Sequence, residues 1–175
     1  MEDIVKQALK KWPNVPDCYG WLALDARGDW YLRDERVQRA GPFPQAKGSR
    51  VEHERLRDFI ARNYLADSHG QWFFQNGPQR VYVDLETSPW VWRLARGTAS
   101  PSITSQTGTE AAFESAWLDE RGRLFLATDL GLGIVHTLDM GFAAEAVDAG
   151  WWAPTEIRCA ELPERFGFVL KPKAP

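Results

Sequence analysis

The sequence predicts an α+β fold in which antiparallel β-hairpins dominate and two or three helices pack against them. Three observations predict it: short apolar segments of strand length, turn residues between them, and few segments with helical spacing. The chain has 175 residues, 44% hydrophobic and 26% charged, which is typical of a globular domain. We expect a single domain over residues 1–175. An alternative is two similar halves at 13–95 and 110–171, joined by a polar connector at 97–109.

The N-terminal part is predicted to form a helix and then a hairpin. Apolar residues recur at helical spacing over 2–12, and a proline follows. Strands are predicted at 19–24 and 29–33, because Gly28 between them suits a tight turn. Residues 41–48 are rich in Gly and Pro and predict a loop.

A second helix is predicted over residues 50–65. It follows Ser49-Arg-Val-Glu52, which has the spacing of a capping box. In that motif a serine and a glutamate satisfy backbone N–H groups at the start of a helix. An apolar stripe then follows at helical spacing, formed by Leu56, Phe59, Ile60 and Tyr64.

Strand-like segments occupy most of the remaining chain. Strands are predicted at 71–75, 80–86, 90–94, 116–119, 123–127, 134–138 and 166–170. A short helix is predicted at 142–150, where small and apolar residues recur before a glycine.

One turn pattern, Asp-x-x-Gly-x followed by a large apolar and an aromatic residue, occurs three times. It begins at Asp25, Asp67 and Asp119. Aspartate caps such a turn and glycine supplies a positive φ, so we expect positive φ at the three glycines. We also expect Trp30 and Trp72 to be buried at matching places. Two interpretations stay open: independent use of a favourable turn, or a duplicated unit of hairpin and helix.

Charge and motif content argue against several classes of function. The net charge is −3, from 21 basic and 24 acidic residues, which does not favour binding to nucleic acid. No apolar run reaches the ~20 residues of a membrane span, and the N-terminus lacks the features of a secretory signal, so we expect a cytoplasmic protein. Cys18 and Cys159, 141 residues apart, predict two reduced thiols, and a single disulfide between them is the alternative. The three histidines have no metal-binding spacing, and we expect neither a metal nor a cofactor.

The chain contains nine Trp, nine Phe and four Tyr, and its aromatic strands predict either core packing or a binding groove. In the second interpretation, strands near 76–80 and 90–93 border a groove for a small molecule or a protein segment. The candidate ligand-binding residues combine apolar surface with hydrogen-bonding groups: Asn76, Gln79, Arg80, Tyr82, Trp90, Trp92 and Arg93.

The function expected from these features is a cytosolic, non-enzymatic module that binds a ligand or another protein. No catalytic motif is present in the sequence, and no catalytic residue is assigned. The alternative is an enzyme of unrecognised type that uses the strand carboxylates Asp84 and Glu86 beside Arg80. Self-association into a homo-oligomer is a further alternative, and the identity of the ligand stays open.

The sequence also resembles a family of uncharacterised proteobacterial proteins, known as a domain of unknown function. The residues that carry the resemblance lie within about 16–92: Gly28-Asp-Trp-Tyr-Leu, Val37-Gln-Arg39, the helix at 50–65, Asp67…Gly70-Gln-Trp-Phe-Phe, Gly77-Pro-Gln-Arg-Val-Tyr-Val-Asp84 and Pro89-Trp-Val. The chain departs from the family where Asn76-Gly-Pro-Gln replaces Thr-Pro-x-Glu and Ser88-Pro-Trp replaces Ala-Pro-Phe, and its C-terminal third matches poorly. The resemblance implies repeated α+β motifs and a role in signalling or ligand binding.

Overall fold

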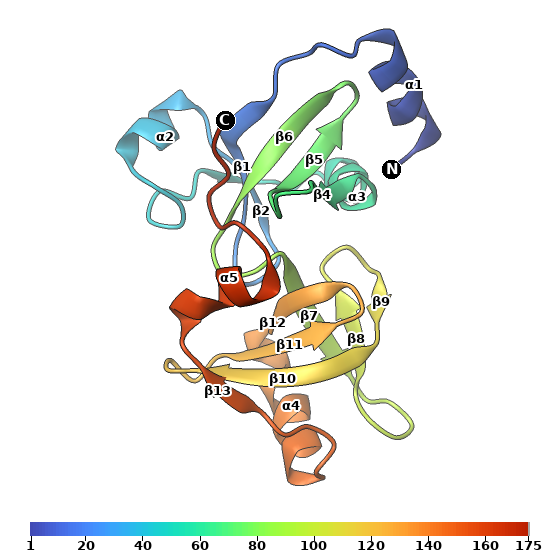
Figure 1. Ribbon diagram of the computed structural model, residues 1–175, viewed down its shortest axis with the longest axis vertical. Helices are drawn as coiled ribbons and strands as arrows, with labels where there is room; N and C mark the ends of the chain where they lie inside the picture. Colours follow the sequence, from blue (N-terminus) through green and yellow to red (C-terminus); the bar gives the residue numbers. More distant parts are fainter. Residues whose placement is uncertain (175) are drawn as a thin grey trace. The chain divides into compact units, whose positions relative to one another are not determined.

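The computed structural model describes residues 1–174 (Figure 1). Its α-helices are α1 (Asp3–Lys11), α2 (Glu35–Ala40), α3 (Glu54–Arg62), α4 (Met140–Asp148) and α5 (Leu162–Phe166). Its strands are β1 (Cys18–Leu24), β2 (Trp30–Leu32), β3 (Ser49–Arg50), β4 (Tyr64–Ala66), β5 (Trp72–Asn76), β6 (Gln79–Leu85), β7 (Trp90–Ala95), β8 (Ser102–Ser105), β9 (Glu110–Ala111), β10 (Phe113–Asp119), β11 (Leu124–Thr128), β12 (Gly131–Val135) and β13 (Thr155–Ile157). The mixed α+β class predicted from the sequence is confirmed.

The chain divides into two compact units. Unit 1 comprises Met1–Asp25, Asp29–Glu86 and the tail from Phe168, and unit 2 comprises Ala26–Gly28 and Thr87–Gly167. The single domain over 1–175 and the duplication into halves stay predictions. The boundaries of the units nevertheless differ from those of the expected halves, because β7 pairs within the second sheet.

Unit 1 is built on a six-stranded sheet with the strand order β3-β2-β1-β6-β5-β4. The hairpins β1–β2 and β5–β6 are antiparallel, as predicted from their turns. The two hairpins meet through β1 and β6, which run parallel. The sheet is therefore mixed rather than a simple set of hairpins. Its core contains Leu22, Leu24, Val83 and Phe73, together with Ile60 of α3, which packs beside β5 (Figure 1).

The predicted capping box is wrong. Ser49 lies in β3, opposite Leu32 of β2, and α3 begins only at Glu54. The N-cap residue of α3 is His53, whose side chain makes no capping hydrogen bond. Pairing of Ser49 with β2 therefore prevails over the local helix signal.

Two further segments differ from the prediction. The loop expected at 41–48 is present, but α2 precedes it and was not predicted; its N-cap Asp34 accepts a hydrogen bond from the backbone N–H of Val37. The strand expected at 166–170 is instead the end of α5 followed by a tail without regular secondary structure. That tail docks on unit 1, because Val169 N–H donates to Gly70 O and Leu85 N–H donates to Leu170 O.

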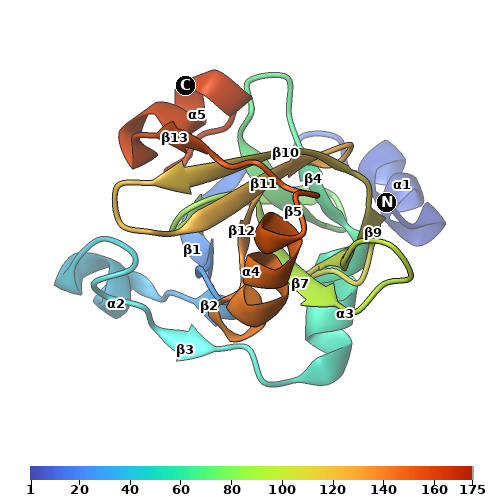
Figure 2. The same ribbon diagram turned by 90° about the horizontal axis from the view of Figure 1, so that it is seen from below.

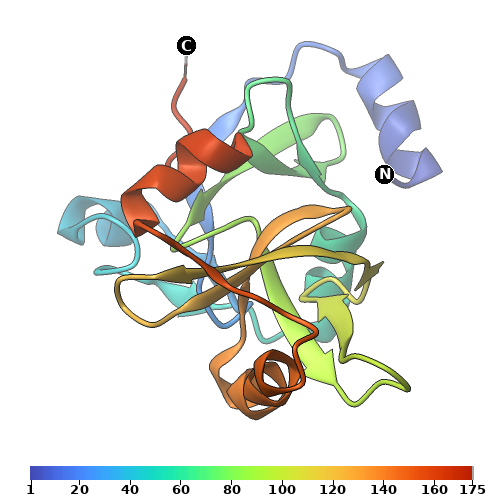
Figure 3. The ribbon, with the colours of Figure 1, turned by 60° about the horizontal axis from the view of Figure 1, so that its bottom comes forward.

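Unit 2 is built on a seven-stranded sheet with the strand order β13-β10-β11-β12-β7-β8-β9. The meander β10–β11–β12 is antiparallel, while β12 with β7 and β10 with β13 run parallel. Figure 2 shows α4 beside this sheet, where it packs against β7. Figure 3 shows β13 running along β10 and leading into α5. Residues 97–109, expected as a polar connector, contain β8.

The Asp-x-x-Gly turns have the predicted geometry. Gly28, Gly70 and Gly122 have φ values of 82°, 74° and 72°. Trp30 is buried as predicted, whereas Trp72 is half-buried. A fourth turn of the same kind, at Ser105–Gly108, was not predicted: the serine hydroxyl accepts from backbone N–H groups where aspartate does elsewhere. Local turn chemistry is therefore shared by both units.

Among residues 1–174, no helix combines the length and the apolar character needed to cross a membrane.

Candidate functional site

The strands predicted to border one groove are not neighbours. β6, which carries Arg80 and Tyr82, pairs with β1 and β5 in the sheet of unit 1. β7, which carries Trp90 and Trp92, pairs with β12 and β8 in the sheet of unit 2. The assumption of adjacent strands was wrong, because the intervening residues 86–89 lead the chain from one sheet into the other.

Trp90 and Trp92 are core residues of unit 2. Their exposed fractions are 8% and 0%, and their rings stack with centroids 6.0 Å apart. The indole N–H of Trp90 donates to Leu130 O at 2.8 Å, and that of Trp92 donates to Leu126 O at 2.9 Å. Buried indoles with satisfied N–H groups stabilise packing. These two residues therefore present no surface to a ligand.

Arg93 is engaged in an ion pair. Its Nε and one terminal nitrogen donate to the two carboxylate oxygens of Asp139, at 2.6 and 3.1 Å. Asp139 also accepts from the backbone N–H of Leu94 at 2.9 Å. The hydrogen bond from Arg93 lowers the pKa of Asp139. This bidentate pair ties β7 to the residue before α4.

Asn76 and Gln79 lie around the β5–β6 turn. The side-chain amide of Gln79 donates to Pro16 O at 2.9 Å. Asn76 lines a mostly apolar cavity of about 250 Å³ in unit 1, together with Cys18, Trp21, Leu22, Leu32, Leu56, Ile60, Phe74 and Val81. Neither residue reaches the larger cavity that Arg80 and Tyr82 line.

Arg80 and Tyr82 line a cavity of about 440 Å³ within unit 1. Its volume lies in the range of small-molecule sites. β1, the β4–β5 turn, β6 and the C-terminal tail all contribute to it. The lining residues are Asp17, Tyr19, Asp67, Ser68, His69, Gln71, Arg80, Tyr82 and Lys173.

Stacked aromatic rings form one wall of this cavity. The rings of Tyr19 and Tyr82 are parallel within 4°, with centroids 4.6 Å apart. Phe73 packs against Tyr82 at 5.6 Å, and the guanidinium carbon of Arg80 lies 4.8 Å from the Phe73 centroid. These contacts hold Arg80 above a rigid aromatic surface.

Asp67 connects this wall to the β4–β5 turn. Its carboxylate accepts from the backbone N–H groups of His69 and Gln71, each at 2.9 Å, and from the hydroxyl of Tyr82 at 3.1 Å. Partial burial raises the pKa of Asp67, but these hydrogen bonds outweigh burial and leave the pKa below its ordinary value. Asp67 is therefore a positioning residue that fixes the Tyr82 hydroxyl.

The sequence provided no signal for Tyr19 or Lys173 at this site. Tyr19 reaches it because β1 pairs in parallel with β6, a contact between distant segments. Lys173 reaches it because the tail docks on unit 1, where its backbone N–H donates to Gln71 Oε1 at 3.1 Å. Only Arg80 and Tyr82 of the seven predicted residues lie in this cavity.

The strand carboxylates of the predicted enzyme alternative have structural partners. Asp84 pairs with Arg33 at 3.1 Å, and Arg33 is 3% exposed and also donates to the carbonyls of Gly41 and Ala46. Burial raises the pKa of Asp84, although the charge of Arg33 opposes this. Glu86 lies 3.8 Å from Lys47. Both carboxylates thus hold the segment after α2 against the sheet.

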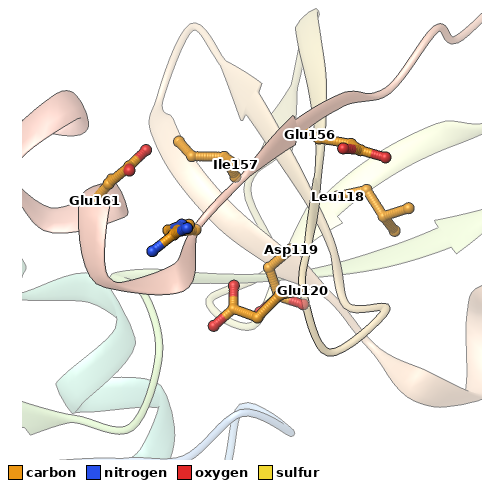
Figure 4. Close-up of a pocket in the computed structure, with 7 residues that line it drawn as sticks. Leu118, Asp119, Glu120, Glu156, Ile157 and Glu161 are labelled. Atoms are coloured by element: carbon orange, nitrogen blue, oxygen red, sulfur yellow. The ribbon is translucent and has the colours of Figure 1, made fainter.

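Unit 2 contains a separate acidic cavity of about 400 Å³ (Figure 4). Potential ligand atoms of Asp119, Glu120 and Cys159 lie within 4.8 Å of one another. Asp119, however, pairs with Arg123 at 2.7 Å and caps its turn. Figure 4 shows Glu156 and Glu161 well apart from Glu120. Of the four carboxylates that line the cavity, Glu156 and Glu161 therefore do not join the cluster of Asp119, Glu120 and Cys159.

The Glu120 carboxylate accepts two hydrogen bonds from Cys159, which follows β13 in the chain. The thiol of Cys159 donates to one carboxylate oxygen at 2.9 Å, and the Cys159 backbone N–H donates to the other at 2.8 Å. These bonds lower the pKa of Glu120 to about 2, and the same carboxylate raises the pKa of the Cys159 thiol. The thiol is held in its protonated, weakly nucleophilic form.

Comparisons with known proteins find a family model that matches the chain and solved structures of similar fold. The fold is similar to that of a DUF1285 family protein from Silicibacter pomeroyi DSS-3, with a TM-score of 0.51 and 11% identity over 75% of this chain and 72% of that one. A DUF1285 family protein from Shewanella baltica OS155 gives a TM-score of 0.47 and 15% identity over 71% of this chain and 91% of that one. No curated protein matches the sequence. Residues 1–173 match DUF2944, described as "Protein of unknown function (DUF2946)", and the chain belongs to that family.

Proposed function

We propose that the protein is a non-enzymatic module that binds a small molecule in the cavity lined by Tyr19 and Tyr82. One observation carries the proposal: a stacked tyrosine pair, fixed by Asp67, forms the wall of a cavity of about 440 Å³ that also has charged side chains. An apolar wall with a few placed polar groups is the usual composition of a ligand site.

The pre-formed geometry of the wall supports binding. The Tyr82 hydroxyl is held by Asp67, and Tyr19 is held by its stack on Tyr82. A surface that is already ordered loses little conformational entropy when a ligand binds.

An interaction with another protein is a second candidate. The smaller apolar cavity of unit 1 supports it, because its lining residues Trp21 and Leu32 are 42% and 48% exposed. Exposed apolar residues beside a groove are typical of interaction surfaces. A signalling role, a proteobacterial origin, a cytoplasmic location and homo-oligomerisation stay predictions.

A fragment screen followed by NMR tests the proposed function. Fragments should perturb the amide signals of residues 67–71 and 80–82, and Tyr19→Leu should weaken their binding while preserving a cooperative thermal transition. Tyr31→Leu, which changes a half-buried tyrosine of β2 outside the cavity, is the matched control and should bind fragments as the wild type does. Perturbation confined to the signals of Trp21 and Leu32 would favour the interaction surface instead.

A further inference from the structure

We infer that the ligand of the Tyr19–Tyr82 cavity carries a compact anionic group, a carboxylate or a phosphate, held by Arg80 and Lys173. This inference rests on the proposed function and specifies the chemical class of the ligand. Both cations line the cavity, one from β6 and the other from the C-terminal tail.

Arg80 is free to bind an anion. Its side chain is exposed, and its guanidinium lies over the ring of Phe73. Within residues 1–174, Arg80 has no carboxylate partner within ion-pair distance, whereas Arg33, Arg93 and Arg123 all do. Stacking on an aromatic face leaves the N–H edge of a guanidinium available, and that edge can donate to two oxygens at once.

Lys173 is brought to the same cavity by an ordered segment of the tail. Backbone hydrogen bonds join Val169 to Gly70 and Leu170 to Leu85, and Pro172 is buried. The Lys173 backbone N–H donates to Gln71, which itself lines the cavity. No carboxylate in the described part of the chain pairs with the Lys173 ammonium.

The two carboxylates of the cavity differ in their availability. Asp67 is occupied by the two backbone N–H groups and the Tyr82 hydroxyl, so its acceptor positions face its own turn and the tyrosine wall. Asp17 is exposed, and no residue of the described chain donates a hydrogen bond to its carboxylate. The negative charge of Asp17 therefore offsets the positive charge of Arg80 and Lys173, and removing it should strengthen the binding of an anion.

The rest of the ligand is expected to be apolar and flat. Tyr19 is half-buried and offers ring surface to the cavity, while Tyr82 and Phe73, each 4% exposed, support it through stacked and tilted ring contacts. Aromatic walls favour planar apolar groups through dispersion and burial. An aromatic carboxylate or phosphate ester combines both features.

NMR titrations of the full chain with benzoate, phenyl phosphate and benzamide test this inference. The three probes share a phenyl body, and only benzamide lacks the negative charge. At least one anion should bind at the cavity with roughly fivefold or greater preference over benzamide, and that preference should fall as NaCl is raised. The stronger of the two anions identifies the carboxylate or the phosphate class.

Four variants separate the charges. Arg80→Gln and Lys173→Gln should each weaken binding of the preferred anion roughly fivefold and leave benzamide binding unchanged. Asp17→Asn should strengthen anion binding. Lys171→Gln, a change on the same tail outside the cavity, is the control and should bind the anion as the wild type does.

The outcomes distinguish this inference from the proposed function. Equal binding of benzamide and the anions in the cavity would overturn the anionic class and leave the binding function standing. Unchanged anion binding in both Arg80→Gln and Lys173→Gln would overturn it equally. Failure of all three probes, together with a fragment screen negative at this cavity, would contradict the binding function itself.

Discussion

Replacement of Gly133 by alanine tests the packing of the unit 2 core. Gly133 lies in β12 opposite Trp90 of β7, and its φ is outside the left-handed region. An added Cβ would lie 2.5 Å from Cε2 of Trp92 and 2.7 Å from Cβ of Trp90, and closer still to the Trp92 indole nitrogen. Glycine is therefore required at this position because a Cβ would clash with the two tryptophans, and not because of its backbone conformation.

The expected cost follows from how firmly the indole is held. Trp92 cannot rotate away without losing the hydrogen bond to Leu126 O and its stack on Trp90. Overpacking costs about 1–3 kcal/mol, and a weakened buried hydrogen bond costs about 1 kcal/mol more. The smaller entropy of an unfolded alanine chain offsets about 0.5 kcal/mol of this. We therefore expect Gly133→Ala to lower the free energy of unfolding by about 1.5–3.5 kcal/mol.

Urea denaturation and a thermal melt, both followed by tryptophan fluorescence, measure this effect. For a chain of this length, the melting temperature should fall by about 3–14 °C. Gly141→Ala is the matched control, because a Cβ there would meet no atom within 4 Å and Gly141 lies in α4. That change should stabilise the protein by about 0.5–1 kcal/mol. A Gly133→Ala protein that unfolds like the wild type would refute the packing of Trp92 described here.

Three further predictions follow from individual contacts. Glu120→Gln removes the charge that raises the pKa of the Cys159 thiol, so iodoacetamide should alkylate that thiol faster at pH 8; an unchanged rate would contradict the hydrogen bond. Asp139 has a lowered pKa in the folded state, so its stabilisation is present above the ordinary carboxyl pKa and is lost as the pH falls through the lowered value. Asp139→Asn should therefore lower the free energy of unfolding by about 1–2 kcal/mol at pH 7. The difference between the urea midpoints of variant and wild type should be smaller at pH 3 than at pH 7. An equal difference at the two pH values would count against this ion pair. Asp34→Ala should lower the free energy of unfolding by about 1 kcal/mol, because it removes the α2 cap. In the same denaturation assay, Ser49→Ala should stay within about 0.5 kcal/mol of wild type. A larger loss in Ser49→Ala than in Asp34→Ala would support the capping box instead.

The hairpins were predictable because their turns depend on residues close together in the sequence. In the turn at Asp119, the carboxylate accepts from the backbone N–H groups of Arg121 and Arg123, and Gly122 adopts a positive φ. Such preferences act over five residues and leave a clear pattern. The same locality explains why the first helix and α4 were found near their predicted positions.

Pairing between distant strands was not predictable in this way. The parallel contacts of β1 with β6 and of β7 with β12 decide which strands share a sheet. In each pair the two strands are separated by several other helices or strands in the sequence. No pattern within a single strand indicates which distant strand it will pair with. The candidate groove failed for this reason, since it assumed that β6 and β7 were neighbours.

At the candidate site, too, local sequence patterns identified some residues, and contacts between distant segments placed the others. Arg80 and Tyr82 were identified from the pattern of their own strand, while Tyr19 and Lys173 required the folded chain. Long-range contacts also overrode a local signal at Ser49, where pairing with Leu32 displaced the expected start of a helix.

A crystal structure of the full chain grown with the preferred anion tests the central claim most directly. The account predicts that the ring of that ligand lies against Tyr19, which stacks on the buried Tyr82, and that its charged group lies within hydrogen-bond distance of Arg80 and Lys173. A ligand that binds in solution but occupies another place in the crystal, with this cavity empty, would contradict the claim.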